Sequence, residues 1–186
     1  MALKQNKSIY QIVNNLQSND DMASSMKNML LKMRNKGLQE SLSDFEGSEH
    51  KLEMVTTIKE IDFINDSSST TLNGVWFALS SMTRNTTWIT SANDLNGIVS
   101  RLHSQIEEKV KVVVLLGVYD TSIHDYFLKM GKEVITSMNM EEAVRAAFYK
   151  SKPNDVILFS PGVVSGGNYI TYRERGKAFK NAVAQL

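Results

Sequence analysis

The stretch Lys109-Val-Lys-Val-Val-Val-Leu-Leu-Gly117 decides the fold class of this chain. Its β-branched and leucine residues predict a strand over 110–117, and such near-continuous apolar runs are typical of parallel sheets covered on both faces. Gly117 ends the strand at the carboxyl edge, where open α/β sheets place their ligands. Lys111 interrupts the run, which is also far too short to cross a bilayer as a helix, so we expect no membrane span.

The elements on either side of this stretch continue the pattern, because strands alternate with amphipathic helices. Further strands are predicted over 87–90, 133–136 and 155–160, and helices over 70–82, 93–107, 122–130, 140–150 and 172–186. Apolar residues between Leu52 and Ile64 predict two short antiparallel strands with a turn near Lys59-Glu60. The series predicts an α/β fold with a mostly parallel, Rossmann-like sheet of about six strands, helices on both faces and right-handed crossovers.

The first part of the chain has a different pattern. Residues 8–45 are predicted to be helical, and one helix face carries Met22, Met26, Met29, Leu30 and Met33. We therefore divide the chain into a helical N-terminal segment, 1–45, and an α/β domain, 46–186. The apolar stripe needs a cover, so we expect the segment either to fold back over the sheet or to form a homodimer.

Charge and composition exclude several classes of function. The chain has 186 residues and a net charge of +1, so we expect no nucleic-acid partner. It has no cysteine and no secretory signal at its start, and we expect a cytoplasmic protein without disulfides or thiolate chemistry. Its histidines, His50, His103 and His124, have no metal-ligand spacing with carboxylates, so we expect no metal site.

Two segments carry a more specific signal. One is Ile61-Asp-Phe-Ile-Asn-Asp-Ser-Ser-Ser-Thr-Thr71; the other is Asp155-Val-Ile-Leu-Phe-Ser-Pro-Gly-Val-Val-Ser165, which runs into Tyr172-Arg-Glu-Arg-Gly-Lys-Ala-Phe179. In this order they resemble the C-terminal domain of the Mur ligases. Within that family the likeness is greatest to the enzymes that add D-glutamate in peptidoglycan synthesis, and it extends from Ser43 onward.

The resemblance also indicates what the chain lacks. The family's enzymes have three domains: one binds the UDP-sugar, one holds a glycine-rich phosphate loop, and the third, resembled here, brings the incoming amino acid. Gly131-Lys132 and Gly176-Lys177 have neither the upstream glycine nor the following hydroxyl of a phosphate loop. We therefore expect no catalytic residue and no cofactor in this chain alone, with ATP and Mg²⁺ only if another chain completes it. Residues 1–45 would be the remnant of the central domain or its replacement.

Several motif positions of the family are altered here. The family's Asn-Asp-Ser-Lys-Ala-Thr-Asn motif is Asn65-Asp-Ser-Ser-Ser-Thr-Thr71, with Ser68 in place of the lysine that contacts the incoming glutamate. Lys51 stands in place of an arginine near the nucleotide. The loop after the strand over 87–90 is about four residues shorter than in the family and lacks its lysine.

In the last motif, Ser165 and Tyr169 align with a serine and an aromatic residue that hold the amino acid, whereas Gly167 replaces an aspartate. We therefore expect a residual site for a small acidic ligand at the carboxyl edge of the sheet, near Ser91. Its candidate residues are Asp66, Ser67, Ser68, Thr70, Ser160, Ser165 and Tyr169. A local alternative stays open, because Asp66, Ser67 and Thr70 are also suited to cap the helix over 70–82. Gly162, Gly166 and Gly167 fit either an anion-binding nest or a plain loop.

These expectations leave three functions. The leading one is a truncated, non-catalytic Mur ligase homologue with a binding or regulatory role in peptidoglycan precursor synthesis, which contacts a precursor or a full-length Mur ligase. The alternative is a subunit that completes an ATP-dependent D-glutamate-adding amide ligase in trans. The third is a scaffold whose N-terminal helices pair with those of a second copy.

Overall fold

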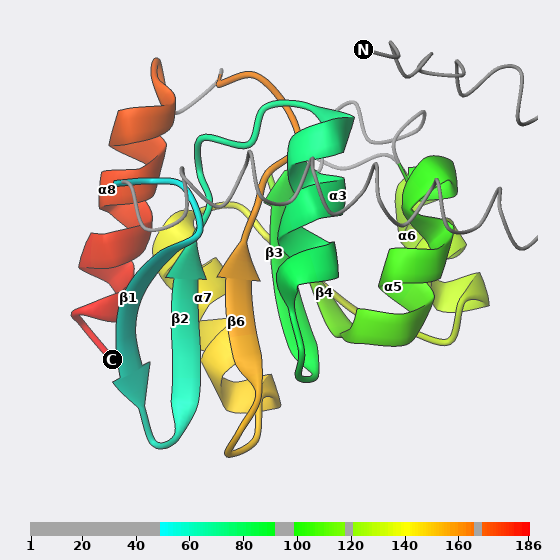
Figure 1. Cartoon of the computed structure of the whole chain (residues 1–186), viewed down its shortest axis with the longest axis horizontal. Helices are drawn as coiled ribbons and strands as arrows, with labels where there is room; N and C mark the ends of the chain where they lie inside the picture. The colour runs from blue at the N-terminus through cyan, green and yellow to red at the C-terminus, as the bar shows by residue number, and fades with distance from the viewer. Residues whose placement is uncertain (1–48, 92–98, 118–120, 166–168) are drawn as a thin grey trace, which may run out of the picture. The chain divides into compact units, whose positions relative to one another are not determined.

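The computed structural model describes residues 49–91, 99–117, 121–165 and 169–186. Within this part of the chain, six strands form one sheet in the order β1-β2-β6-β3-β4-β5 (Figure 1). The strands are β1 (Glu53–Ile58), β2 (Ile61–Asn65), β3 (Thr86–Ser91), β4 (Val110–Leu116), β5 (Glu133–Ser137) and β6 (Val156–Phe159). β1 is antiparallel to β2 and every other pair of neighbours is parallel, which confirms the predicted sheet.

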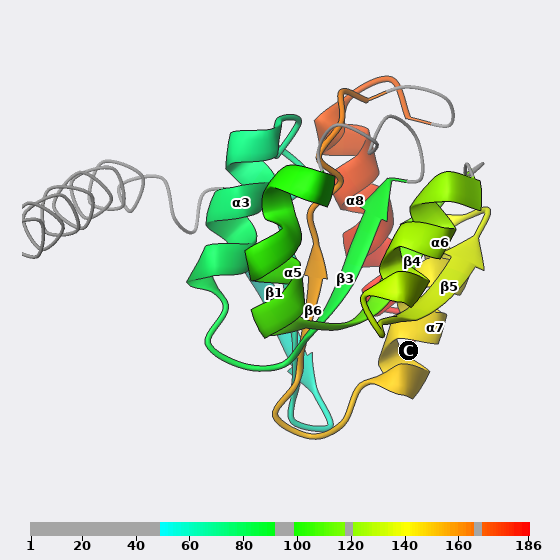
Figure 2. The same ribbon diagram turned by 90° about the vertical axis from the view of Figure 1, so that its right-hand side faces the viewer.

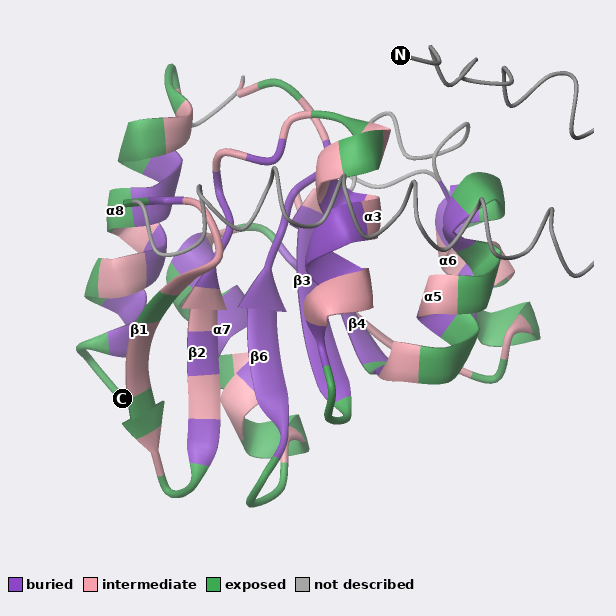
Figure 3. Ribbon diagram, in the orientation of Figure 1, coloured by how far each residue is buried: buried purple, intermediate pink, exposed green. Residues whose placement is uncertain are grey.

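Helices cover both faces of the sheet, as the alternating pattern predicts (Figure 2). They are α3 (Leu72–Ser81), a short turn η1 (Ser100–Leu102) leading into α5 (His103–Lys109), α6 (Thr121–Lys129), α7 (Met140–Lys150) and α8 (Tyr172–Val183). One apolar cluster joins α3, α5 and α6 to one face, and a second cluster joins α7 and α8 to the other. The central strands β3 and β6 are buried, whereas the edge strand β1 is partly exposed (Figure 3). The other edge strand, β5, is also partly exposed.

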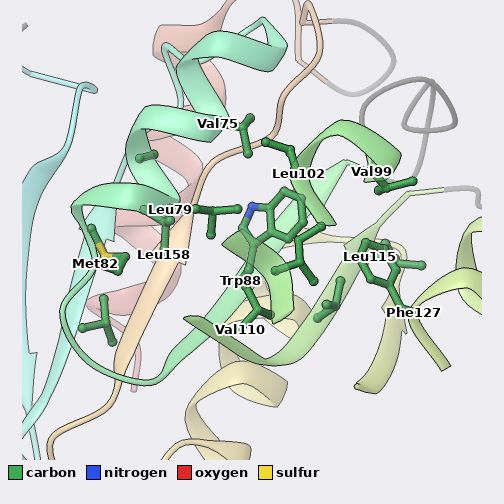
Figure 4. Packing of buried hydrophobic residues seen from close by; sticks show 14 of the residues in the cluster. Val75, Leu79, Met82, Trp88, Val99, Leu102, Val110, Leu115, Phe127 and Leu158 are labelled. Carbon is green, nitrogen blue, oxygen red and sulfur yellow. The ribbon is translucent and has the colours of Figure 1, made fainter. Parts of the chain in front are cut away.

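Trp88 of β3 lies at the centre of the first cluster (Figure 4). Its ring meets Phe127 of α6 edge-on, with 6.1 Å between the ring centroids. Full burial of such a side chain stabilises the fold by roughly 2–3 kcal/mol. The indole N–H donates to the carbonyl of Ser160 at 2.8 Å, so the same residue ties the core to the segment that follows β6.

Some predicted boundaries differ from the structure. α3 begins at Leu72, two positions later than predicted, and the helix predicted over 93–107 is described only from Val99, because 93–98 lie outside the described residues. The turn predicted at Lys59-Glu60 is confirmed. Both residues have positive φ, 48° and 62°, as in the two-residue hairpin turns whose twist matches that of the strands.

The chain divides into two units, Met1–Phe45 and Glu46–Leu186, and the second is described here by itself. The helices predicted over 8–45 and their apolar stripe lie outside the described residues and stay predictions. No helix in the described ranges is long and apolar enough to cross a membrane.

Candidate functional site

Three chain segments meet at the carboxyl edge of the sheet, where β2, β6 and β3 end side by side. The amide of Asp66 donates to the carbonyl of Phe159 at 2.8 Å, and the amide of Gly162 donates to the carbonyl of Ser69 at 3.0 Å. On the other side, the amide of Ser91 donates to the carbonyl of Pro161 at 3.3 Å. The predicted convergence of the segments that follow these strands is therefore present.

Asp66 is the central side chain of this edge and is only 1% exposed. Its carboxylate accepts hydrogen bonds from the Ser160 hydroxyl at 2.7 Å and from the Leu52 amide at 3.3 Å. Burial raises the pKa of Asp66 to about 6, although the hydroxyls of Ser69 and Ser160 act in the opposite direction. The carboxylate thus links the segments that precede β1, follow β2 and follow β6.

The capping role considered for Asp66, Ser67 and Thr70 is wrong. The N-cap of α3 is Thr71, whose hydroxyl accepts from the amide of Gly74 at 3.3 Å. Asp66 lies too far upstream of α3, and its carboxylate accepts from Leu52 and Ser160, which are distant in sequence, as well as interacting with the nearby Ser69 hydroxyl. Capping preference is a local signal, and here long-range hydrogen bonds decide the role of the residue.

His50 and Asn65 form a buried pair beside Asp66 that the motif comparison does not single out. The side-chain amide of Asn65 donates to Nδ1 of His50 and to Oε2 of Glu53, at 2.9 Å each. Burial lowers the pKa of His50, so the ring is neutral at pH 7 and its Nδ1 acts as an acceptor. The sequence signal for this pair is weak: one histidine between the acidic residues Glu49 and Glu53, just before a strand.

Arg175 of α8 is the second buried ionisable group of this edge, and it is 5% exposed. Its guanidinium donates to the carbonyl of Ser67 at 2.9 Å and to the carbonyl of Val163 at 3.2 Å. Burial lowers the pKa of Arg175 to about 10, at which the side chain is still charged at pH 7. Its spacing from Phe179 and Val183 places it on the buried face of α8, but the sequence does not show which carbonyls it contacts.

The other candidate residues are less enclosed. Ser68 and Thr70 are partly exposed, and the amide of Ser68 donates to the carbonyl of His50 at 2.9 Å. Ser165 and Tyr169 are also partly exposed, and Tyr169 packs against the apolar cluster of α7 and α8. Gly166 and Gly167 lie outside the described residues, so the choice between an anion nest and a plain loop stays open.

The side chains of this edge offer neutral hydroxyls, the buried carboxylate of Asp66 and the buried cation of Arg175. Within the described ranges, no group of three or more His, Asp or Glu side chains could hold a metal ion. The hydroxyl groups of this edge are suited to donate hydrogen bonds to a carboxylate ligand.

No protein-family profile matches the chain. The chain is 36% identical to the UDP-N-acetylmuramoylalanine–D-glutamate ligase of Christiangramia forsetii, over 89% of this chain and 37% of that protein. The enzyme of the same name from Bacteroides fragilis is 33% identical over 90% of this chain and 38% of its own length. The chain therefore spans little more than a third of these relatives.

Among solved structures, UDP-N-acetylmuramate–alanine ligase from Thermotoga maritima matches 78% of this chain and 32% of its own chain. Its TM-score is 0.50 and its sequence identity is 17%, so this likeness concerns the fold alone.

Proposed function

We propose a function from the premise that the chain is a homologue of the C-terminal portion of the Mur ligases. It serves in peptidoglycan precursor synthesis as a binding or regulatory module, and it does not catalyse ligation by itself. Its ligand is a small amino-acid carboxylate of the D-glutamate class, the amino acid named for the relatives in the sequence comparison.

The observation that carries this proposal is how the ionisable groups at the carboxyl edge are used. Asp66 is bound by Ser160 and by the Leu52 amide, and Arg175 donates to backbone carbonyls. Both groups hold the protein's own segments together. ATP-dependent ligation needs exposed cations around the transferred phosphoryl group, and Ser68 supplies a neutral hydroxyl where the resembled motif has a lysine.

We expect the chain alone to show no micromolar binding of Mg-ATP in a calorimetric titration. The sequence has no glycine-rich phosphate loop, so the triphosphate lacks a cradle of backbone amides. The Bacteroides fragilis ligase, titrated in the same buffer, serves as the control. A micromolar dissociation constant for the chain alone would contradict the proposal. Micromolar binding that requires a second chain would instead favour completion of a ligase in trans, an alternative that the limited coverage of the relatives supports.

We expect D-glutamate to shift the backbone amide signals of Ser165 and Tyr169 in a heteronuclear NMR titration. Neutral hydroxyls and a buried cation favour a carboxylate at this edge. L-Glutamate is the control ligand for stereospecificity, and Ser165→Ala is the control variant that removes the hydroxyl while keeping the backbone. Signals that move only on a distant surface, or that do not move at all, would rule out a D-glutamate site here.

A further inference from the structure

The first turn of α8 is hydrogen-bonded to described residues on both sides of Ser165 and Tyr169, namely Val163 before them and Ile170 and Thr171 after them. At one end, Oε2 of Glu174 accepts from the amides of Ile170 at 2.8 Å and Thr171 at 3.3 Å. The Thr171 hydroxyl accepts in turn from the Glu174 amide at 3.2 Å, which completes a capping box. The C-terminal end of the segment is therefore anchored at α8.

Arg175, the next residue along the helix, anchors the other end. Both of its terminal nitrogens donate to the carbonyl of Val163, two residues before Ser165. One of them also donates to the carbonyl of Ser67, which belongs to the turn after β2 and lies 108 positions away in the sequence. One planar guanidinium thus joins two segments that are candidates for the ligand site, each through a backbone carbonyl.

A lysine at this position would not reproduce the joint. Guanidinium presents several N–H groups in a rigid plane, whereas an ammonium is a point charge at the end of a flexible chain. Arg175 is also unusual as a buried cation. Burial lowers its pKa, and no carboxylate among the described residues raises that pKa again.

We propose that Arg175 is the positioning residue of the carboxyl edge, and that it sets the place of Ser165 relative to the turn at Ser67. Arg175 does this through its bonds to Val163 and Ser67. This assignment rests on the proposed function, so it is tested by one readout with ligand and one without.

The experiment compares four proteins by heteronuclear NMR, with D-glutamate as the probe. Arg175→Lys keeps the positive charge but loses the planar array of N–H donors of the guanidinium. Arg175→Gln loses both the charge and that array. Arg173→Gln is the matched control, because Arg173 is in the same turn, is exposed and contacts the ring of Tyr172 at 5.0 Å. The Arg173→Gln variant also removes one arginine charge from α8, but from the exposed surface of the helix.

Without ligand, we expect Arg175→Lys to move the amide signals of Val164 and Ser165 together with those of Ser67 and Ser68, and to leave signals of β4 in place. With D-glutamate, we expect the dissociation constant to rise at least about tenfold for Arg175→Lys, and further for Arg175→Gln. Arg173→Gln should match the wild type in both readouts. Unmoved amides and unchanged affinity in Arg175→Lys would overturn the assignment.

The two readouts separate the two proposals. If the wild type binds no D-glutamate but Arg175→Lys moves both groups of amides, the proposed ligand is wrong and the positioning role stands. If the Arg175 variants do not fold, the wild type alone provides the test through exchange of its arginine side-chain protons with solvent. The Nη protons of Arg175 should exchange at least about a hundredfold more slowly than those of Arg173, because buried hydrogen bonds protect them. Equal exchange rates would reject the role.

Discussion

Replacing Gly176 by alanine is expected to destabilise the domain by about 2–4 kcal/mol, although alanine is the better helix former. Gly176 is buried in α8, and a Cβ atom there would lie far inside van der Waals contact with Nδ1 of His50 and the hydroxyl of Ser67. Neither neighbour can move away easily, because the His50 ring is held by Asn65 and both residues are enclosed. Urea unfolding followed by circular dichroism measures the change in unfolding free energy.

Asn181→Ala is the matched control for this substitution, because Asn181 lies in the same helix on its exposed face. We expect the control to change the unfolding free energy by no more than about 0.5 kcal/mol. Gly74→Ala should fall between the two variants, since its Cβ would approach the Ser69 hydroxyl at 2.8 Å, less closely than the Cβ at position 176 would approach His50. A Gly176→Ala protein as stable as the wild type would show that α8 does not pack against His50 as described.

Replacing Asp66 by asparagine is expected to stabilise the domain at pH 7.5 by up to about 3 kcal/mol and to leave it unchanged near pH 4. The pKa of Asp66 is about 6 in the folded protein, against an ordinary value of 3.8. The folded state therefore binds the proton more tightly, and the contribution of Asp66 to stability falls as the pH rises from about 4 to about 6. Asparagine resembles the protonated acid at every pH: its oxygen accepts from Leu52, and its amide donates to the Ser160 hydroxyl.

Unfolding free energies of the two proteins, measured between pH 4 and pH 8, check this expectation. His50 titrates in part of the same range with the opposite sign, because its pKa is lowered. Both proteins contain His50, so its contribution cancels when the unfolding free energy of one protein is subtracted from that of the other at each pH. Asp62→Asn is the control: Thr57 and Arg84 lower the pKa of Asp62, so its loss should slightly destabilise the protein at pH 7.5. A less stable Asp66→Asn protein at pH 7.5 would contradict the raised pKa.

The sheet could be predicted from the sequence because its strands are apolar runs separated by amphipathic helices, a periodic signal within each segment. The meeting of Asp66 and Ser160 could also be predicted, since each directly follows a strand and parallel strands share a carboxyl edge. The role of the Asp66 carboxylate could not be predicted, because the local sequence favours a helix cap whereas the hydrogen bond to Ser160 spans 94 positions.

The surroundings of Asp66 were hidden from sequence patterns for a different reason. His50 and Leu52 have positive φ, 72° and 42°, and neither is the glycine that usually marks such a backbone. Arg175 lies four residues before Phe179, on the buried face of α8, but the carbonyls of Ser67 and Val163 that its guanidinium contacts cannot be read from the helix pattern. These features depend on tertiary packing, which no local pattern encodes.

The place of β6 in the sheet also determines when the domain can fold during its synthesis. β6 is the last strand of the described chain to leave the ribosome, yet it lies between β2 and β3 and is hydrogen-bonded to both. Until it is made, the hairpin of β1 and β2 and the three strands β3, β4 and β5 are separate half-sheets, each with an unpaired edge. Contacts of such long sequence separation form slowly, and open edges invite pairing with other chains. We therefore expect the nascent chain to expose these strand edges until β6, which ends at Phe159, has emerged.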